Sequence, residues 1–293
     1  MQKINEPKKL ARYFFGSLLL INIGIWHAVF SSPAKGVLTI SFLDIGQGDA
    51  IYIEAPNGAQ AIVDGGPGRI IMSELSAVMP FGDKNIDAII ITNPDKDHMA
   101  GFLDVFDKYK VDFVFEPGTV SKTQTYQAIK KAEIDEGAIK IIARRGMDIV
   151  LDEKNNVYIR ILFPDKDVSR YSTNDGSIVA KLVYGETSVL LEGDAPQKTE
   201  NYLLSLNKGK EVNELDSDIL KVGHHGSRTS TAYEYVKSSS PEYAVISLGA
   251  DNKYGHPHIE TLNTLNSLGV PILRTDTMGR ITFVSNGKKF VRQ

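Results

Sequence analysis

The stretch Thr92-Asn93-Pro94-Asp95-Lys96-Asp97-His98-Met99-Ala100-Gly101 follows Ile86-Asp87-Ala88-Ile89-Ile90-Ile91, an apolar run with the length of a strand. Apolar residues at positions 102, 103, 105 and 106 then recur at roughly helical spacing. The acidic cluster therefore sits where a buried strand ends and a helix begins. Asp95, Asp97 and His98 offer oxygen and nitrogen ligands, a mixed set that suits zinc or manganese. The alternative is a solvated acidic turn in which Asp97 caps the next helix.

Metal-capable side chains follow three further apolar strands. Asp64 comes after Ile62-Val63, Asp194 comes after Leu190-Leu191, and His224-His225 comes after residues 219–222. Each of these alone is a common kind of turn residue. A metal site, however, draws its ligands from distant positions, so the recurrence predicts one shared site at a sheet edge.

The rest of the chain predicts an α/β fold. Residues 37–53 indicate a strand, a Gly-rich hairpin and a second strand, and the first half then alternates strands with helices. The second half adds more strands and a few short helices, with no Pro/Gly/Ser linker after residue 37. We expect one domain over residues 35–293, with two sheets between helical layers. Helices are expected near 69–78, 102–108, 123–135, 195–206, 231–237 and 259–268.

Composition limits the chemistry. The 293 residues include no cysteine, so a thiol nucleophile and a thiolate ligand are excluded. Net charge is −3, and residues 33–293 carry 29 basic and 35 acidic side chains once the four basic and one acidic residues of 1–32 are subtracted. A polyanionic substrate would therefore need a local basic patch and metal ions, because the global field would repel it.

The N-terminus differs from the rest of the chain. Lys3, Lys8, Lys9 and Arg12 precede a mostly apolar run over residues 13–30, the layout of a signal peptide or signal anchor over residues 1–34. As a helix this run would reach about 27 Å, just enough for a bilayer core. Ser32-Pro33-Ala34 is a possible cleavage site, and an amphipathic core helix is the alternative. The expected localisation is membrane-anchored with the catalytic domain outside the cytoplasm, or secreted.

Histidine is scarce, and four of the six residues form two pairs. His224-His225 lies between glycines, which permit a tight turn, and either ring is a candidate ligand. His256-Pro257-His258 would either close over the site or cap the following helix.

Taken together and in order, several segments resemble the metallo-β-lactamase superfamily, and within it the hydrolase-like domains of the ComEC family of competence DNA-uptake proteins. The resemblance covers residues 37–293. It is carried by the segments 42–50, 64–66, 92–101, 174–177, 193–194, 221–227 and 254–258. It implies an αββα sandwich with one or two divalent ions, Mn²⁺ or Zn²⁺, at the sheet edge.

The family's His-x-His-x-Asp-His pattern is altered here. Its first histidine is Asn93 and its second is Asp95, and its third histidine falls near Asn174 to Ser177, where the chain has none. The resemblance implies that the second metal position is retained, with Asp97, His98, a bridging Asp194, and His224 or His225. Oxygen-rich ligation favours manganese over zinc.

These ligands suggest roles for the residues around them. Asp97 would orient a metal-bound water and act as base, while His225 or His256 would stabilise charge or protonate the leaving oxygen. The residues expected to bind substrate are Asn93, Asn174, Ser177, Lys221, Ser227, Arg228 and His258, with Lys96 adding to a phosphate-binding patch.

The first functional hypothesis is an extracytoplasmic, metal-dependent hydrolase of phosphodiesters, a nuclease linked to DNA uptake that serves a separate channel or acts alone. The second is a phosphodiesterase acting on cell-wall or small-molecule phosphoesters. The third is a degenerate module that binds DNA or a partner without catalysis, which Asn93 and the missing histidine favour. β-Lactam and thioester hydrolysis are disfavoured, because those branches use the fuller set of histidines.

Overall fold

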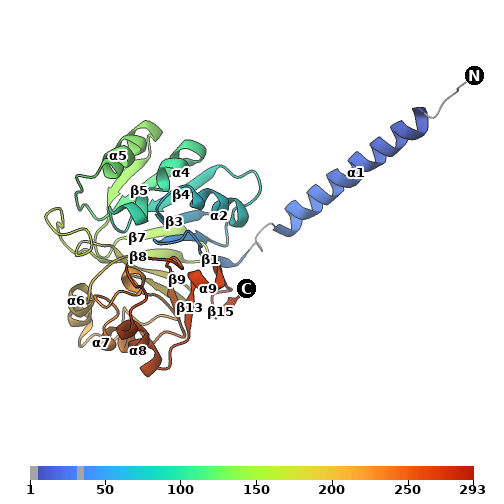
Figure 1. Cartoon of the computed structure of the whole chain (residues 1–293). Helices are drawn as coiled ribbons and strands as arrows, with labels where there is room; N and C mark the ends of the chain where they lie inside the picture. The colour runs from blue at the N-terminus through green and yellow to red at the C-terminus, as the bar shows by residue number, and fades with distance from the viewer. Residues whose placement is uncertain (1–5, 32–35) are drawn as a thin grey trace, which may run out of the picture.

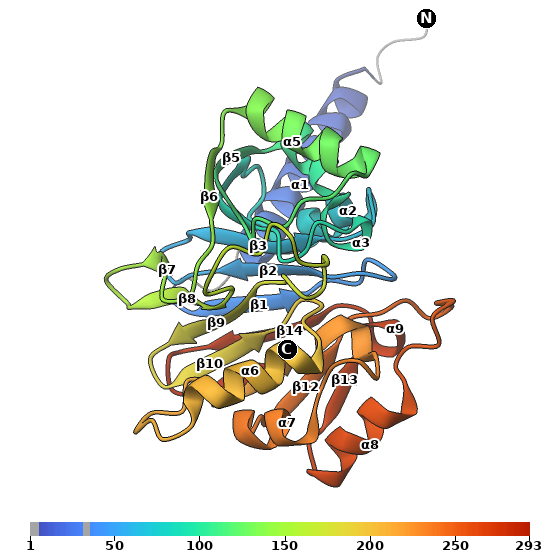
Figure 2. The same ribbon diagram turned by 90° about the vertical axis from the view of Figure 1, so that its left-hand side faces the viewer.

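The computed structural model describes residues 6–31 and 36–293, with side chains for 11–24 and 36–293. Two β-sheets face each other and helices cover both outer faces, as Figure 1 and Figure 2 show. This is the four-layer α/β arrangement expected from the sequence.

The first sheet contains eight strands in the order β15-β14-β1-β2-β3-β4-β5-β6. Strands β3 to β6 pair in parallel, whereas β1, β2, β14 and β15 join by antiparallel pairing. The strands are β1 Leu38–Phe42, β2 Ala50–Glu54, β3 Gln60–Gly65, β4 Asn85–Ile90, β5 Lys110–Glu116, β6 Ile139–Ile142, β14 Ile281–Ser285 and β15 Phe290–Arg292. The helices on its outer face are α2 Ile70–Val78, α4 Phe102–Lys108 and α5 Gln124–Glu136.

The second sheet contains seven strands in the order β13-β12-β11-β10-β9-β8-β7. They are β7 Asp148–Asp152, β8 Val157–Phe163, β9 Val179–Tyr184, β10 Thr187–Leu191, β11 Ile219–Lys221, β12 Tyr243–Ile246 and β13 Ile272–Arg274. Its outer helices are α6 Gln197–Asn207, α7 Tyr233–Ser239 and α8 Ile259–Ser267. Three short segments complete the set, namely α3 Lys96–Met99, the 3₁₀ turn η1 Gly223–Gly226 and α9 Thr275–Met278.

The core follows the two-residue period of the strands. In β2, Ile51 and Ile53 face the other sheet, while Ala50 and Tyr52 pack under the outer helices. All four are buried, because this sheet is covered on both faces. A continuous apolar run therefore marks a central strand here, which is why the sequence pattern located so many of them.

Parallel pairing places the candidate ligands at one edge. Strand β3 pairs with β4 so that Val63 lies beside Ile90, and β10 pairs with β11 so that Leu191 lies beside Lys221. The residues that follow each pair leave the sheets at their carboxyl ends. The acidic cluster, Asp194 and the His-His segment all arise in this way.

Two local expectations differ from the structure. The acidic cluster was expected to be a loop, but residues 96–99 form the short helix α3. The helix expected from residue 231 begins instead at Tyr233, because Thr231 has a left-handed φ of 66°. The Thr231 and Ala232 N–H groups donate to the buried carboxylate of Glu200. This contact cannot be predicted from the local sequence.

Helix α1 spans Glu6–Ser31, and its side chains from Ala11 to Gly24 are exposed. Among the helices that the structure describes, none combines the length and apolarity required to cross a membrane. The expectation of a transmembrane helix is therefore not supported. The cleavage site predicted at 32–34, and Lys3 of the basic flank, lie outside the described residues.

Candidate metal centre

Four side chains from three separate segments converge at the carboxyl edge of the sheets. Asp97 and His98 lie on α3, Asp194 follows β10, and His225 lies in the turn after β11. His98 Nε2 is 3.1 Å from Asp194 Oδ2. His225 Nε2 is 3.5 Å from Asp97 Oδ2 and 3.7 Å from Asp194 Oδ1. The predicted strand-end ligands thus come together in space.

The donor atoms of this cluster lack other partners. His98 Nε2, His225 Nε2 and Asp194 Oδ1 are buried and have no hydrogen bond. Buried polar atoms are normally satisfied, so a group of unpaired ones facing the same space calls for an ion. Asp97, His98 and His225 each supply one ligand atom within 4.8 Å of the others. Two imidazoles and two carboxylates therefore fit a divalent transition-metal ion.

Hydrogen bonds on the far side of each imidazole fix its orientation. His98 Nδ1 is 2.8 Å from Asp64 Oδ2, and Asp64 is itself held by the N–H and hydroxyl of Thr92, at 2.8 and 2.6 Å. His225 Nδ1 donates to the carbonyl of Ser247 at 3.0 Å. In both rings this leaves Nε2 free for the metal. Asp64, a candidate ligand from its strand-end position, therefore orients His98 from behind.

A buried ion pair lies behind His225. Lys221 Nζ is 2.8 Å from Asp49 Oδ2, and the other oxygen of Asp49 is 3.3 Å from His225 Nδ1. Burial alone would raise the pKa of Asp49, but Lys221 and His225 hold it well below its usual range. Sequence reasoning gave Asp49 no role in the site. The available signal was its place after Gly46-Gln47-Gly48 at the start of a strand.

The backbone at the site adopts uncommon conformations. His224 and His225 have φ values of 48° and 54°, in the left-handed region that few non-glycine residues occupy. Strained residues of this kind concentrate at functional sites, where the surrounding structure holds them. Gly48 meets a second constraint, because a Cβ there would lie 2.2 Å from the carbonyl oxygen of Asp97. The glycine lets the 46–49 loop pack directly on α3.

The electrostatics favour proton-bearing histidines when no metal is bound. Burial lowers the pKa of His98, but Asp194 and Asp64 outweigh it and hold the pKa well above the ordinary value. The pKa of His225 rises to about 9, because Asp49 and Asp194 outweigh its burial. Burial raises the pKa of Asp194 less than His98 and His225 lower it, so its pKa is far below normal. A metal ion bound here would replace these protons.

Asp97, Asp194 and His225 line an open pocket of about 180 Å³, while His98 is fully buried beside it. Gln47, Asp95, Asn174, Tyr254 and His256 line it together with the metal-facing side chains. A second hollow of about 450 Å³ shares Gln47, Asp97 and Tyr254 with this pocket. The two therefore form one continuous depression in the surface.

The family model described as "Metallo-beta-lactamase superfamily" matches residues 43–250. The chain belongs to the metallo-β-lactamase superfamily. ComE operon protein 3 of Bacillus subtilis (strain 168) is 29% identical over 262 residues, covering 83% of this chain and 32% of that protein. Competence protein ComA of Neisseria gonorrhoeae is 28% identical over 244 residues, with the same two coverages. The resemblance to competence proteins expected from the sequence is confirmed.

Recombination protein 2 of Haemophilus influenzae is 27% identical over 282 residues, covering 94% of this chain and 32% of that protein. The chain thus spans about a third of the length of these relatives. Among solved structures, the diiron β-hydroxylase CmlA from Streptomyces venezuelae matches with a TM-score of 0.54 and 14% identity, over 89% of this chain and 55% of that chain. This match supports the fold.

Asn93 and Asp95 stand where the superfamily pattern has its first two histidines, and both are held in hydrogen bonds. Asn93 is fully buried, donates to Asn174 Oδ1 at 3.0 Å and accepts the Asp95 N–H at 3.0 Å. Asp95 accepts a hydrogen bond from the Thr173 hydroxyl at 2.9 Å. Burial raises the pKa of Asp95, with Thr173 opposing it. An amide and hydroxyl network therefore occupies the place of two nitrogen ligands.

The remaining histidines lie above the cluster. His224 Nε2 is 3.7 Å from Asp194 Oδ2, while its Nδ1 is 3.2 Å from the Thr229 hydroxyl. The His256 ring centroid is 5.6 Å from that of His224, and Tyr254 stacks on His256 at 5.6 Å. Burial and the neighbouring His225 and His224 lower the pKa of His256 to about 4. His256 is thus a neutral imidazole at the pocket wall.

The residues predicted to bind substrate divide by exposure. Asn174, Arg228 and His258 reach the surface, and His258 Nδ1 accepts the Arg228 N–H at 3.2 Å. Four others are buried, namely Asn93, Ser177, Lys221 and Ser227. The structure does not support substrate binding by Lys221, because its side chain is 1% exposed and its ammonium is engaged by Asp49.

Proposed function

We propose that this protein is a metal-dependent hydrolase of phosphodiester bonds in nucleic acid, acting in DNA uptake. The observation that carries the proposal is the set of unpaired, buried donor atoms on His98, His225 and Asp194, facing Asp97 at the floor of an open pocket. The similarity to competence proteins supports the choice of nucleic acid.

The ligand set supports binding of a single divalent ion by Asp97, His98, Asp194 and His225. Such an ion supplies a water of lowered pKa and polarises a phosphoryl oxygen. Two of these four ligands are carboxylates, which favours manganese over a purely nitrogen-bound zinc. The buried Asn93–Asn174 network beside Asp95 supports one ion over two.

Residues around the metal position would accept a proton from water and bind the substrate. Burial raises the pKa of Asp97, but His225, with its Nε2 3.5 Å away, and the charge of His98 bring that pKa below the usual value. Asp97 is thus ionised and, with its side chain 33% exposed, can accept a proton from an attacking water. His256 is neutral, so its role is to donate a hydrogen bond to an oxygen of the substrate. His224 lies between His256 and Asp194, where it would stabilise charge on the phosphate.

The surroundings of the pocket support a phosphate-bearing substrate that extends beyond it. The adjoining hollow of about 450 Å³ is lined by Lys96, Lys253 and Tyr254 among others. Two ammonium groups and an aromatic ring suit the phosphate and base of a nucleotide. The protein as a whole is acidic, at −3, and Asp97 and Asp251 line the same hollow, so a polyanion would have to contact the two lysines directly.

The proposal is tested with the full-length protein, after metal removal and reloading with manganese. Bound metal, cleavage of plasmid and single-stranded DNA, and hydrolysis of bis-p-nitrophenyl phosphate are measured. Asp97→Asn should lower kcat/KM on every substrate by at least about a hundredfold, a general base alone contributing about 10²–10⁴. Asp107→Asn is the matched control, because Asp107 is exposed on the following helix α4 and away from the pocket. Absence of both metal and activity would refute the proposal.

A second candidate is hydrolysis of small phosphoesters. It is favoured by the metal pocket itself, which at about 180 Å³ holds a phosphate group with little attached to it. Cleavage of the small ester without cleavage of either DNA would favour this function. Salt-dependent retention of DNA without any hydrolysis would instead favour a non-catalytic binding module.

A further inference from the structure

A separate hollow of about 360 Å³ lies between helix α6 and the segment that follows β8. It shares no residue with the metal pocket. Its volume falls within the range of about 300–1,000 Å³ that small-ligand pockets occupy. The proposed function, as stated above, assigns it no role.

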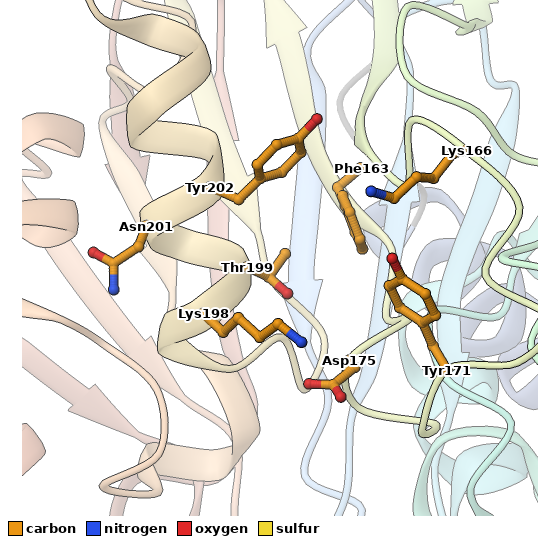
Figure 3. A pocket seen from close by; sticks show the side chains of 8 residues that line it. All are labelled: Phe163, Lys166, Tyr171, Asp175, Lys198, Thr199, Asn201 and Tyr202. Atoms are coloured by element: carbon orange, nitrogen blue, oxygen red, sulfur yellow. The ribbon is translucent and has the colours of Figure 1, made fainter.

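Aromatic rings form two sides and the floor of this hollow. Figure 3 shows Tyr202 of α6 and Tyr171 of the facing segment on opposite sides of the opening, with Phe163 behind them. Phe163 is 3% exposed, and its ring meets that of Tyr202 edge-on, with centroids 6.3 Å apart. Tyr171 is 36% exposed, so its ring remains accessible. The hollow therefore offers a slot in which a flat ring can stack.

Two lysines flank the slot. The ammonium groups of Lys166 and Lys198 reach the opening from opposite walls, as Figure 3 shows. Lys166 Nζ is 5.7 Å from the ring centroid of Tyr202. Asp175 is the carboxylate among the lining residues, and Asp165 beside them accepts a hydrogen bond from the Tyr202 hydroxyl, so two carboxylates accompany the two lysines. Two amines suit a phosphate, and a carboxylate accepts the N–H groups of a base or the hydroxyl of a sugar.

The hollow is joined to the metal pocket by the chain itself. Asp175, on the rim of the hollow, directly follows Asn174, which lines the metal pocket. One residue before Asn174, the Thr173 hydroxyl donates a hydrogen bond to Asp95 Oδ2 at 2.9 Å. On the other wall, α6 begins at Gln197, three residues after the metal-facing Asp194. A chain of nucleotides with one phosphate at the metal can therefore place a neighbour in this hollow.

We propose that this hollow is a subsite for one nucleotide of a single-stranded nucleic acid, next to the phosphate that is cleaved. The base stacks between Tyr171 and Tyr202, and Lys166 and Lys198 hold its phosphate. A single strand is required, because bases in a duplex have both faces covered by their neighbours. This inference rests on the proposed function for the identity of the polymer, but its test is a binding measurement.

The test uses the full-length protein with metal removed, titrated with a fluorescein-labelled oligothymidylate dodecamer and followed by anisotropy. Tyr171→Ala should weaken binding by about tenfold or more, since stacking on one aromatic ring is worth about 1–3 kcal/mol per base. Lys198→Glu should weaken it further and make the salt dependence shallower. Tyr233→Ala and Lys208→Ala are the controls, because Tyr233 is 45% exposed on α7 and Lys208 ends α6 outside the hollow.

A manganese-loaded sample adds a second readout. In Tyr171→Ala, the ratio of kcat/KM for the dodecamer to that for bis-p-nitrophenyl phosphate should fall about tenfold, which loss of folded protein cannot produce. Binding that depends on Tyr171 and Lys198 without cleavage would support the subsite while the proposed function fails. Cleavage of DNA with both variants binding like the unaltered protein would overturn the subsite alone. Failure of the unaltered protein to bind the dodecamer would also overturn it.

Discussion

Lys221 Nζ and Asp49 Oδ2 are 2.8 Å apart, and both side chains are almost completely buried. The residues are 172 positions apart in the sequence and join the two sheets behind His225. The pair fixes the charge that faces His225 Nδ1, because Asp49 stays ionised beside the lysine. A buried salt bridge thus lies behind the metal-facing histidine, whose ring is fixed by the hydrogen bond from its Nδ1 to the Ser247 carbonyl.

Removing the lysine charge should therefore destabilise the fold. We expect Lys221→Met to lower the free energy of unfolding by about 3–5 kcal/mol, because it leaves a buried carboxylate without its partner. Thermal and urea unfolding measure this. The double variant Lys221→Met/Asp49→Asn should lose less than Lys221→Met alone, since no charge remains unpaired. Lys237→Met, on the exposed face of α7, should change stability by under about 0.5 kcal/mol. Equal losses in single and double variants would contradict the assignment.

Metal binding should release protons. Without metal, the pKa of His225 is about 9 and that of His98 is well above normal, so both rings are protonated at pH 7. A metal ligand must be neutral imidazole, so about two protons should leave for each ion bound, and affinity should increase as pH rises toward 9. Isothermal titration calorimetry in buffers of different ionisation enthalpy counts these protons. His258→Gln should leave the count unchanged. A binding enthalpy independent of the buffer would rule out protonated ligands.

His256 should be neutral throughout the physiological range. Its pKa is lowered to about 4 by burial and by the charges of His225 and His224. Its ring should therefore lose its proton below pH 5, as imidazole ¹⁵N shifts of the metal-free protein would record. His256→Gln should keep the acid limb of the activity profile, because that limb belongs to other groups. A His256 ring that titrates at pH 6.5 or above would show that the surrounding charges are not as described.

The candidate ligands at strand ends could be predicted from the sequence because central strands are apolar on both faces. Two such strands were predicted from Ile89-Ile90-Ile91 and Leu190-Leu191. The polar residues that follow them indicated the carboxyl edge of the sheets. Parallel pairing then made their convergence a geometric necessity. These local patterns predicted the layered fold and a shared site at one sheet edge. The choice of Asp97, His98, Asp194 and one of His224 and His225 came from the family resemblance.

The polar side chains behind the metal-facing residues could not be predicted in this way. Asp49 and Lys221 meet across 172 positions, and a lysine in a strand gives no local sign of burial. The left-handed φ values at His224 and His225 depend on packing around the turn. The apolar run after Arg12 matched a membrane anchor in composition, whereas no described helix meets the requirements for a span. Long-range contacts decided the burial of Lys221 and the backbone at His224 and His225.

A buried pair of acids should make stability depend on pH. Burial raises the pKa of Glu200 to about 7 from the ordinary glutamate value of 4.5, and burial and Glu200 together raise the pKa of Glu192. A carboxyl group that holds its proton more tightly when folded stabilises the protein below pH 4.5, and that stability is lost as pH rises through 7. The upper limit for Glu200 is about 3 kcal/mol, since each tenfold change in proton affinity is worth about 1.4 kcal/mol.

We therefore expect the unfolding temperature to fall between pH 5 and 8, by about 2–4 °C for each kcal/mol lost. Glu192→Gln should flatten this slope, because it removes one of the two titrating acids. Glu211→Gln is the matched control, since Glu211 is exposed. Differential scanning calorimetry across the range makes the comparison, and an unchanged slope in Glu192→Gln would exclude the pair as its source.

Asn93 should limit the number of metal ions. Its amide is fully buried between Asn174 and the Asp95 N–H, at the position where the superfamily pattern has histidine. Asn93→His would place a nitrogen ligand beside Asp95, so bound manganese or zinc, measured by mass spectrometry of the desalted protein, should rise from one ion toward two. The larger ring should also cost about 1–3 kcal/mol of stability through overpacking. Asn93→Ala removes both hydrogen bonds without adding a ligand, and should be less stable by about 1–3 kcal/mol with one ion bound. Two ions in the unaltered protein would show that Asp95 and its neighbours complete a second position without nitrogen.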